Sequence, residues 1–194
     1  MEIIVLGVVA GLSFLSYSLW KRSRSEGLKD ALLEERQQQR LASAEPNLHA
    51  LRPGDVVTHL TTDYVIEGVL TLDDDGRVTR LYKMADAGRI RWLGVRAGVD
   101  EPLFLDEVKG LPIDGSAPDQ LTWDGSPYRL SARASARVGL SGSIGERATA
   151  ERVWLYDYAG VGTRRIVAVG WSDHSAAFAG EPVSRTLLEI LPAS

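Results

Sequence analysis

The sequence predicts an all-β domain of two related antiparallel meanders, forming a sandwich or a partly closed barrel, preceded by an N-terminal transmembrane helix and a helical stalk. Three observations support this. Residues 3–20 contain no charged side chain, residues 25–44 are rich in strong helix formers, and the chain after Leu51 alternates polar and apolar residues between Gly- and Pro-rich turns. The expected segments are an anchor with a basic collar (1–24), a stalk (25–47) and a β domain (48–194).

The apolar run from Ile3 to Trp20 has the length of a membrane span. An uncharged helix of this length rises about 27 Å, close to the ~30 Å hydrocarbon core of a bilayer. Basic residues follow the run, and the only charged side chain before it is that of Glu2, so we expect a single-pass anchor in the bacterial inner membrane, with the N-terminus outside and the C-terminal domain in the cytosol. The residues expected at the membrane interface are Tyr17, Trp20, Lys21, Arg22 and Arg24.

The segment that follows is predicted to be an exposed helical spacer. Leu28, Leu32 and Leu41 give only a thin apolar stripe, and a short coiled-coil seam stays open as an alternative. Pro46 ends the helix because proline cannot continue one. The whole chain of 194 residues has a net charge of −4, which argues against nucleic acid as a partner, since phosphate binding draws on clustered Lys and Arg.

After Leu51 the alternation of side chains predicts strands. Asp75-Gly76 is typical of a tight hairpin turn, because such turns need positive φ angles. The expected strands are Asp55–Leu60, Tyr64–Leu72, Val78–Met84, Ile90–Ala97, Leu103–Val108, Tyr128–Leu140, Arg152–Ala159, Arg165–Trp171 and Val183–Leu191.

The strand from Tyr128 to Leu140 has the most regular pattern. Its period of two predicts one apolar face and an opposite face that carries Arg129, Arg133 and Arg137. This second face is either solvated and paired with acids, or a docking stripe for an acidic partner or a phosphorylated ligand. Four tryptophans are expected in the core, and the alternative is that one or two of them lie at a rim and form a binding platform: Trp92, Trp123, Trp154 and Trp171.

The two halves of the β domain are alike, which is compatible with an internal duplication over about 48–110 and 120–192. Each half has a strand opened by Tyr, a strand centred on Tyr and a strand opened by Arg. The first half contains Leu51-Arg-Pro-Gly54-Asp55, Tyr64-Val-Ile-Glu-Gly68, Leu81-Tyr82 and Trp92-Leu-Gly-Val95. The second contains Trp123-Asp-Gly125, Tyr128-Arg-Leu130, Ala136-Arg-Val138 and Tyr156-Asp-Tyr158.

In the order of these motifs, the chain resembles the bacterial family called domain of unknown function 4178, over residues 48–191. The resemblance implies a β-rich fold, no established activity and a membrane-associated assembly. It carries over no catalytic residues.

The remaining polar motifs favour structural roles. His49, His59 and His174 lack the spacing of a metal site, and Ser172-Asp-His174 cannot form a triad along one strand, because adjacent side chains point to opposite faces. We therefore expect no catalytic residue, no cofactor and no metal. The expected function is a non-enzymatic scaffold that holds partners, such as another membrane protein, at the cytosolic face. The alternative is a small-molecule-sensing β domain tethered to the membrane.

Overall fold

The computed structural model describes residues 47–113, 117–145 and 151–193. The predicted transmembrane helix, its interface residues and the stalk up to residue 46 lie outside these ranges. Within them, no helix has the length and apolar character needed to span a bilayer. The elements are β1 (Val56–His59), β2 (Thr62–Asp74), β3 (Arg77–Asp86), β4 (Arg89–Arg96), β5 (Leu103–Val108), β6 (Gln120–Trp123), β7 (Ser126–Gly142), β8 (Arg152–Ala159), β9 (Arg165–Gly170), β10 (Ser175–Pro182), the 3-10 helix η1 (Arg185–Leu187) and β11 (Leu188–Leu191).

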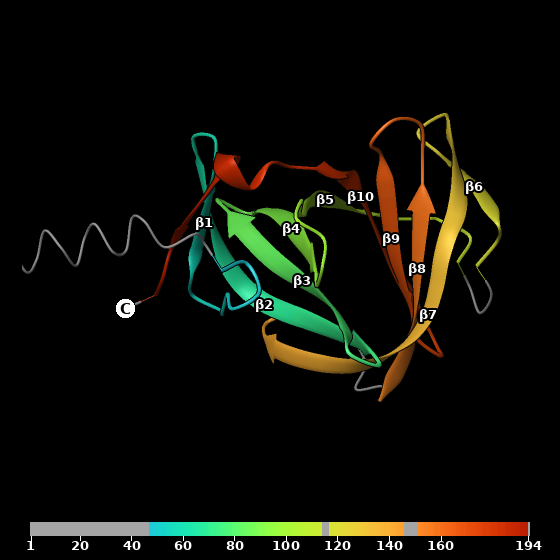
Figure 1. Cartoon of the computed structure of the whole chain (residues 1–194), viewed down its shortest axis with the longest axis horizontal. Coiled ribbons are helices and arrows are strands. Elements are labelled where there is room, and N and C mark those ends of the chain that lie inside the picture. Colours follow the sequence, from blue (N-terminus) through green and yellow to red (C-terminus); the bar gives the residue numbers. More distant parts are fainter. Residues whose placement is uncertain (1–46, 114–116, 146–150, 194) are drawn as a thin grey trace, which may run out of the picture. The chain divides into compact units, whose positions relative to one another are not determined.

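The strands form a closed antiparallel barrel. They follow the spatial order β11-β1-β2-β3-β4-β5-β10-β9-β8-β7-β6. An additional pairing between β2 and β7 closes eight of them into a ring, in the order β2-β3-β4-β5-β10-β9-β8-β7. Figure 1 shows how this happens: β7 bends, so that its first half lies beside β8 and its last half beside β2. The prediction of an all-β fold is confirmed, and of the two architectures left open the structure has the barrel, fully closed.

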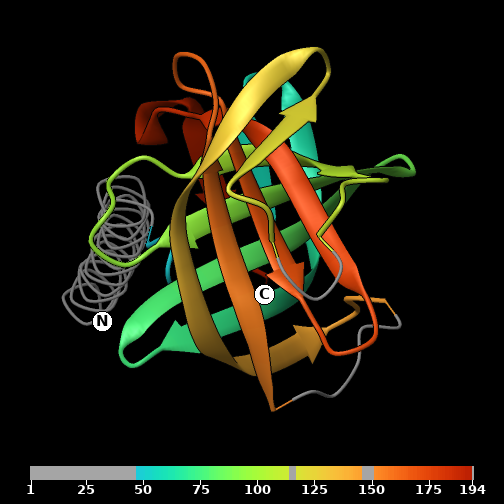
Figure 2. The ribbon, with the colours of Figure 1, turned by 90° about the vertical axis from the view of Figure 1, so that its right-hand side faces the viewer.

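The barrel consists of two consecutive meanders, β2–β5 and β7–β10, which cross at a steep angle in Figure 2. They meet at two seams, β2–β7 and β5–β10. The interior is packed with large apolar side chains, including Trp92, Leu105 and Phe178, none of which is exposed to solvent. Two further apolar clusters cover the outer faces, one under β1, β11 and the chain before β1, and one under β6 and the chain before it.

A β-bulge lies at the same place in the first strand of each meander. In β2 the register shifts between Ile66 and Gly68, and in β7 it shifts between Leu130 and Ala132. An extra residue on one strand turns the following side chains to the other face. The prediction that alternate side chains from Tyr128 to Leu140 all share one face of the strand is therefore wrong. Before the bulge the apolar face of β7 points outward, and after it the apolar face lines the barrel.

Two strands of the sheet, β6 and β10, were not predicted, and the last predicted strand begins too early in the chain. The sequence pattern predicted a strand at Val183–Leu191, but that range holds η1 and β11, while the barrel strand β10 precedes it. Its sequence, SAAFAGEP, is dominated by Ala, Gly, Glu and Pro, which are depleted in strands. The short strand β6 was also missed. The hairpin at Asp75-Gly76 is confirmed, with φ angles of 47° and 95°.

In each meander, one tyrosine hydroxyl donates a hydrogen bond to the backbone of the segment that precedes the meander. The hydroxyl of Tyr82 on β3 donates to the carbonyl oxygen of Leu48 at 2.8 Å, and that of Tyr158 on β8 donates to Pro118 at 3.0 Å. Burial raises the pKa of Tyr82 to about 12. These bonds attach the outer apolar clusters to the barrel.

We predict that Tyr82 makes the domain sensitive to alkali. Above the ordinary tyrosine pKa of about 10, the unfolded chain releases a proton that the folded chain retains. The free energy of unfolding should therefore fall between about pH 10 and pH 12, by about 2 kcal/mol. Tyr82→Phe should be less stable at pH 8 by about 1 kcal/mol, through the lost hydrogen bond, yet lose less on going to pH 11. Denaturant titrations at the two pH values measure both effects, and parallel curves for the two proteins would contradict the prediction.

Candidate functional site

One end of the barrel is open and holds a cavity of about 290 Å³. Its floor is apolar, formed by Leu81, Gly94, Leu103, Val167 and Pro182. Polar and charged side chains surround this floor; they are Thr79, Arg96, Glu101, Ser131, Asp157 and Arg165. The lining residues come from both meanders, so the cavity exists only in the closed barrel.

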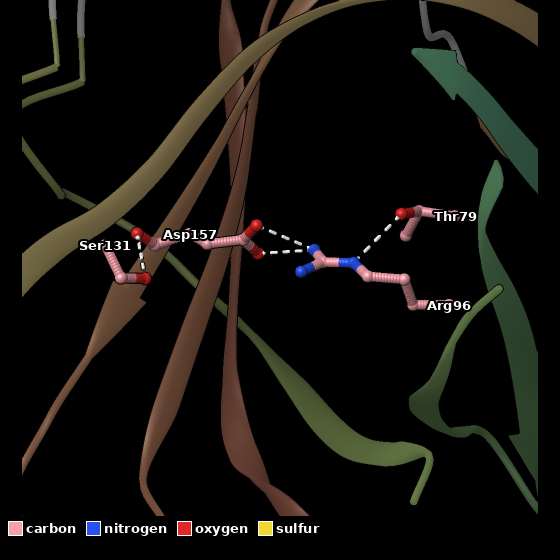
Figure 3. Close-up of polar contacts among 4 residues, drawn as sticks. All are labelled: Thr79, Arg96, Ser131 and Asp157. Atoms are coloured by element: carbon pink, nitrogen blue, oxygen red, sulfur yellow. Dashed lines mark hydrogen bonds and ion pairs between the residues drawn. The ribbon is translucent and has the colours of Figure 1, made fainter. Parts of the chain in front are cut away.

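An ion pair crosses this open end between strands that are not neighbours (Figure 3). Nη2 of Arg96, on β4, lies 2.7 Å from both carboxylate oxygens of Asp157, on β8. Nε of Arg96 also donates to Oγ1 of Thr79 at 3.3 Å. The Asp157 side chain is 16% exposed and that of Arg96 37%. The pair is thus held in a fixed geometry while remaining accessible from solvent.

Local sequence explains how these side chains reach the barrel interior. Tyr156 and Tyr158 pack into the outer apolar cluster, so the residue between them, Asp157, points inward. Ser131, the extra residue of the β7 bulge, donates from Oγ to the backbone oxygen of Asp157 at 3.0 Å. Gly94, two residues before Arg96, also lines the cavity, and a Cβ atom there would lie only 3.2 Å from a methyl group of Leu105.

The opposite end of the barrel can be compared position by position. Gly68 and Ala132 are the first residues after the two bulges, and they pair with Lys83 and Asp157. Lys83 on β3 thus corresponds to Asp157 on β8. The carboxylate of the open end has its counterpart in an ammonium group that pairs with Glu67 at 2.7 Å.

The same comparison gives the counterpart of Arg96. Lys83 pairs with Trp92, and Asp157 pairs with Val167. Four residues beyond Trp92 lies Arg96, and four beyond Val167 lies Trp171. Trp171 is 6% exposed and belongs to the interior apolar cluster, so a buried indole occupies the position that corresponds to the arginine at the other end. The two ends have the same backbone plan and different chemistry.

The arginines of the expected docking stripe lie elsewhere. Because of the bulge, Arg129 is on the opposite face from the other two. Arg133 donates to the Ala117 carbonyl at 2.9 Å and lies 5.5 Å from the Tyr156 ring centroid, outside the barrel. Arg137 is 3.8 Å from Asp73. The structure does not bring the three together, and their role in docking stays a prediction.

The other motifs singled out in the sequence have structural surroundings. His174 stacks on Trp171, with ring centroids 4.6 Å apart, and its hydrogen bond with Asp173 lowers the pKa of that carboxyl. His59 packs at 4.5 Å from Phe104, and burial lowers its pKa. Within the described ranges, no group of three or more His, Cys, Asp or Glu side chains is arranged to hold a metal.

The four tryptophans divide between core and surface. Trp92 and Trp171 are buried in the barrel, and Trp123 packs partly against the outer cluster of the second meander. Trp154 is 48% exposed, so the expectation that all four lie in the core is wrong, and for this residue the alternative of a position outside the core holds. Together with Trp171 it lines a second, open depression of about 280 Å³ at the end of the barrel opposite Arg96.

Sequence reasoning missed the residues of the open end. Arg96 and Asp157 are 61 positions apart, and each looks like an ordinary polar residue at the end of a strand. One signal was available: Val153 and Leu155 share the inward face of β8, and the next inward position is a carboxylate instead of a third apolar residue. A charge at an inward position needs a partner.

A family model described as "Domain of unknown function (DUF4178)" matches residues 52–185. The match covers more than half of the 194 residues, so the chain belongs to this family, and the resemblance seen in its motifs is confirmed. No curated protein and no solved structure matches the chain.

Proposed function

Given membership of a family whose description assigns no activity, we propose that the β domain binds a small molecule in the open end of its barrel, while residues 3–20 anchor the chain in a membrane. The observation that supports this most is the difference between the two barrel ends. At corresponding positions, Trp171 packs into the interior apolar cluster at one end, whereas Arg96 and Asp157 form an ion pair in a cavity at the other. Apolar packing alone would have favoured an apolar side chain at both.

The cavity has the character of a ligand site. Ligand pockets combine mainly apolar walls with a few placed polar groups, and typically enclose about 300–1,000 Å³. At about 290 Å³ this one is at the lower limit, which favours a small metabolite. The cross-barrel bridge of Arg96 and Asp157 positions polar groups before a ligand arrives, so little ordering is needed on binding.

A double variant compared with the wild type tests this function. Arg96→Met with Asp157→Leu replaces the ion pair by apolar side chains of similar size, which in other proteins is neutral or stabilising. The double variant should fold, fill the cavity and lose binding. Saturation-transfer NMR of the full chain in micelles, with a library of small polar fragments, should reveal binders of the wild type that the double variant does not bind. Equal binding to both proteins, or no binder at all, would refute the proposal.

The anchor and its orientation are part of the proposal. The apolar run at residues 3–20 and the cations after it support a single-pass topology with the β domain in the cytosol. A reporter that is active only outside the cytosol, fused after Ser194, should be silent. Strong reporter activity would show that the β domain lies outside the cytosol and would contradict the proposed orientation.

A scaffold that binds another membrane protein is the second candidate, and one surface feature favours it. An apolar row crosses five strands through direct pairings. It consists of Leu191, Val56, Val65, Ala85 and Ile90. Leu191, Val65 and Ile90 are 58%, 46% and 46% exposed. Val65→Lys with Ile90→Lys should abolish a specific crosslink in intact membranes, whereas Val161→Lys, at an isolated exposed position, should keep it; loss in both would count against this candidate.

A further inference from the structure

We propose that the molecule bound in the open end carries a single carboxylate group on a short apolar body, and that Arg165 with the outer edge of Arg96 binds the carboxylate. This inference rests on the proposed function. The inference is based on the hydrogen-bond donors and acceptors in the cavity that have no partner, and on the charges of the side chains that carry them.

Donors outnumber acceptors in this cavity. Arg96 uses Nε and Nη2 toward Thr79 and Asp157, and its Nη1 has no partner among the described residues. Among the described residues, Arg165 makes one hydrogen bond, from Nη1 to the Arg164 carbonyl at 2.9 Å, and no ion pair. Guanidinium groups present N–H donors in a planar fork that matches a carboxylate.

The acceptors are largely occupied. Both oxygens of Asp157 accept from Arg96. Glu101 lies at the exposed rim, where water screens its charge. A cationic ligand would therefore have to displace Arg96 from Asp157 while Arg165 repels it. The site favours an anion.

The charge balance favours one negative charge over two. Arg96 is neutralised by Asp157, so the interior side chains leave one uncompensated cation, Arg165. A monoanion restores neutrality, whereas a dianionic phosphate would add a charge near two carboxylates. Behind these groups the floor of Leu81, Leu103 and Val167 offers only apolar surface, which suits a short hydrocarbon or aromatic body.

Three probes of one shape and different charge test the ligand class. Benzoate, benzamide and benzylamine are titrated against the full chain in micelles by ligand-observed NMR. Benzoate should bind saturably and in a salt-dependent manner, and the other two should not. Arg165→Gln should weaken benzoate binding by about tenfold or more, the usual effect of losing a charged hydrogen-bond donor. The control Arg137→Gln, at a side chain that is 62% exposed and outside the cavity, should leave it unchanged.

The possible failures separate the two proposals. Binding of benzylamine instead, equal binding of all three, or fragment binders that compete with none of the probes would overturn the carboxylate assignment and leave a ligand site in the barrel. Benzoate binding that survives both Arg165→Gln and the double variant Arg96→Met with Asp157→Leu would place the anion elsewhere and overturn the inference. A fragment library without any binder overturns the proposed function, and this inference with it.

Discussion

Gly180→Ala is expected to destabilise the domain strongly, because the neighbouring strand leaves no room for a Cβ atom at this position. A Cβ atom at Gly180 would lie 2.0 Å from the carbonyl oxygen of Phe104 and 3.0 Å from the Cα atom of Leu105. Both are backbone atoms of β5, so no rotamer change can relieve the contact. Since Gly180 pairs directly with Leu105, β10 and β5 would have to move apart at a seam that joins the two meanders.

The expected cost is at least about 3 kcal/mol, the upper range for overpacking a well-packed interior. For a domain of this size each kcal/mol lowers the melting temperature by about 2–4 °C. Gly139→Ala is the matched control. Gly139 lies in the other seam, between β7 and β2, and a Cβ atom there would be 3.6 Å from the Cβ of Thr71, an ordinary contact. Thermal melts followed by near-UV circular dichroism should show a large shift for the first variant and almost none for the second; equal shifts would mean that the β5–β10 seam is not the tight closure described.

The strands that sequence predicted best are those whose own composition favours strands. The pattern placed Leu103–Val108 and Arg152–Ala159 at the residues where β5 and β8 lie. It failed for β10, whose small residues are there because the neighbouring strand approaches closely, as the contact at Gly180 shows. A strand chosen for close approach carries a weak local signal, because tertiary packing overrides propensity.

The bulges and the barrel closure were beyond local reasoning for a related reason. A bulge adds one residue and reverses the faces of everything after it, as at Ser131, but it leaves the alternating pattern of letters intact. Closure depends on the pairing of β2 with the far half of β7. The open end needs both, because Asp157 faces Arg96 only when the second meander has folded back onto the first.

Trp171→Ala is also expected to have a large effect, and its comparison with Arg96→Ala tests whether the two barrel ends serve different purposes. Trp171 is 6% exposed and packs within the interior cluster. Removing a buried indole leaves a cavity and typically costs about 3–5 kcal/mol. The Arg96 side chain is 37% exposed, and ion pairs that solvent reaches contribute about 0–1 kcal/mol. With the added cost of leaving Asp157 unpaired, Arg96→Ala should destabilise by about 1–2 kcal/mol.

Trp171→Phe separates the loss of packing from the loss of the polar atom. The indole Nε1 of Trp171 is buried and has no hydrogen-bond partner among the described residues. A phenylalanine keeps most of the apolar contact and removes this unsatisfied donor, so its cost should stay below about 1.5 kcal/mol. In denaturant titrations of the three variants, Trp171→Ala should therefore have a much lower free energy of unfolding than the other two. If Arg96→Ala is as destabilising as Trp171→Ala, the arginine maintains the fold at the open end as the indole does at the opposite end, and the main support for a ligand at the open end is lost. If the ranking holds, the barrel tolerates loss of the arginine far better than loss of the indole, which is expected of a residue that serves binding rather than folding.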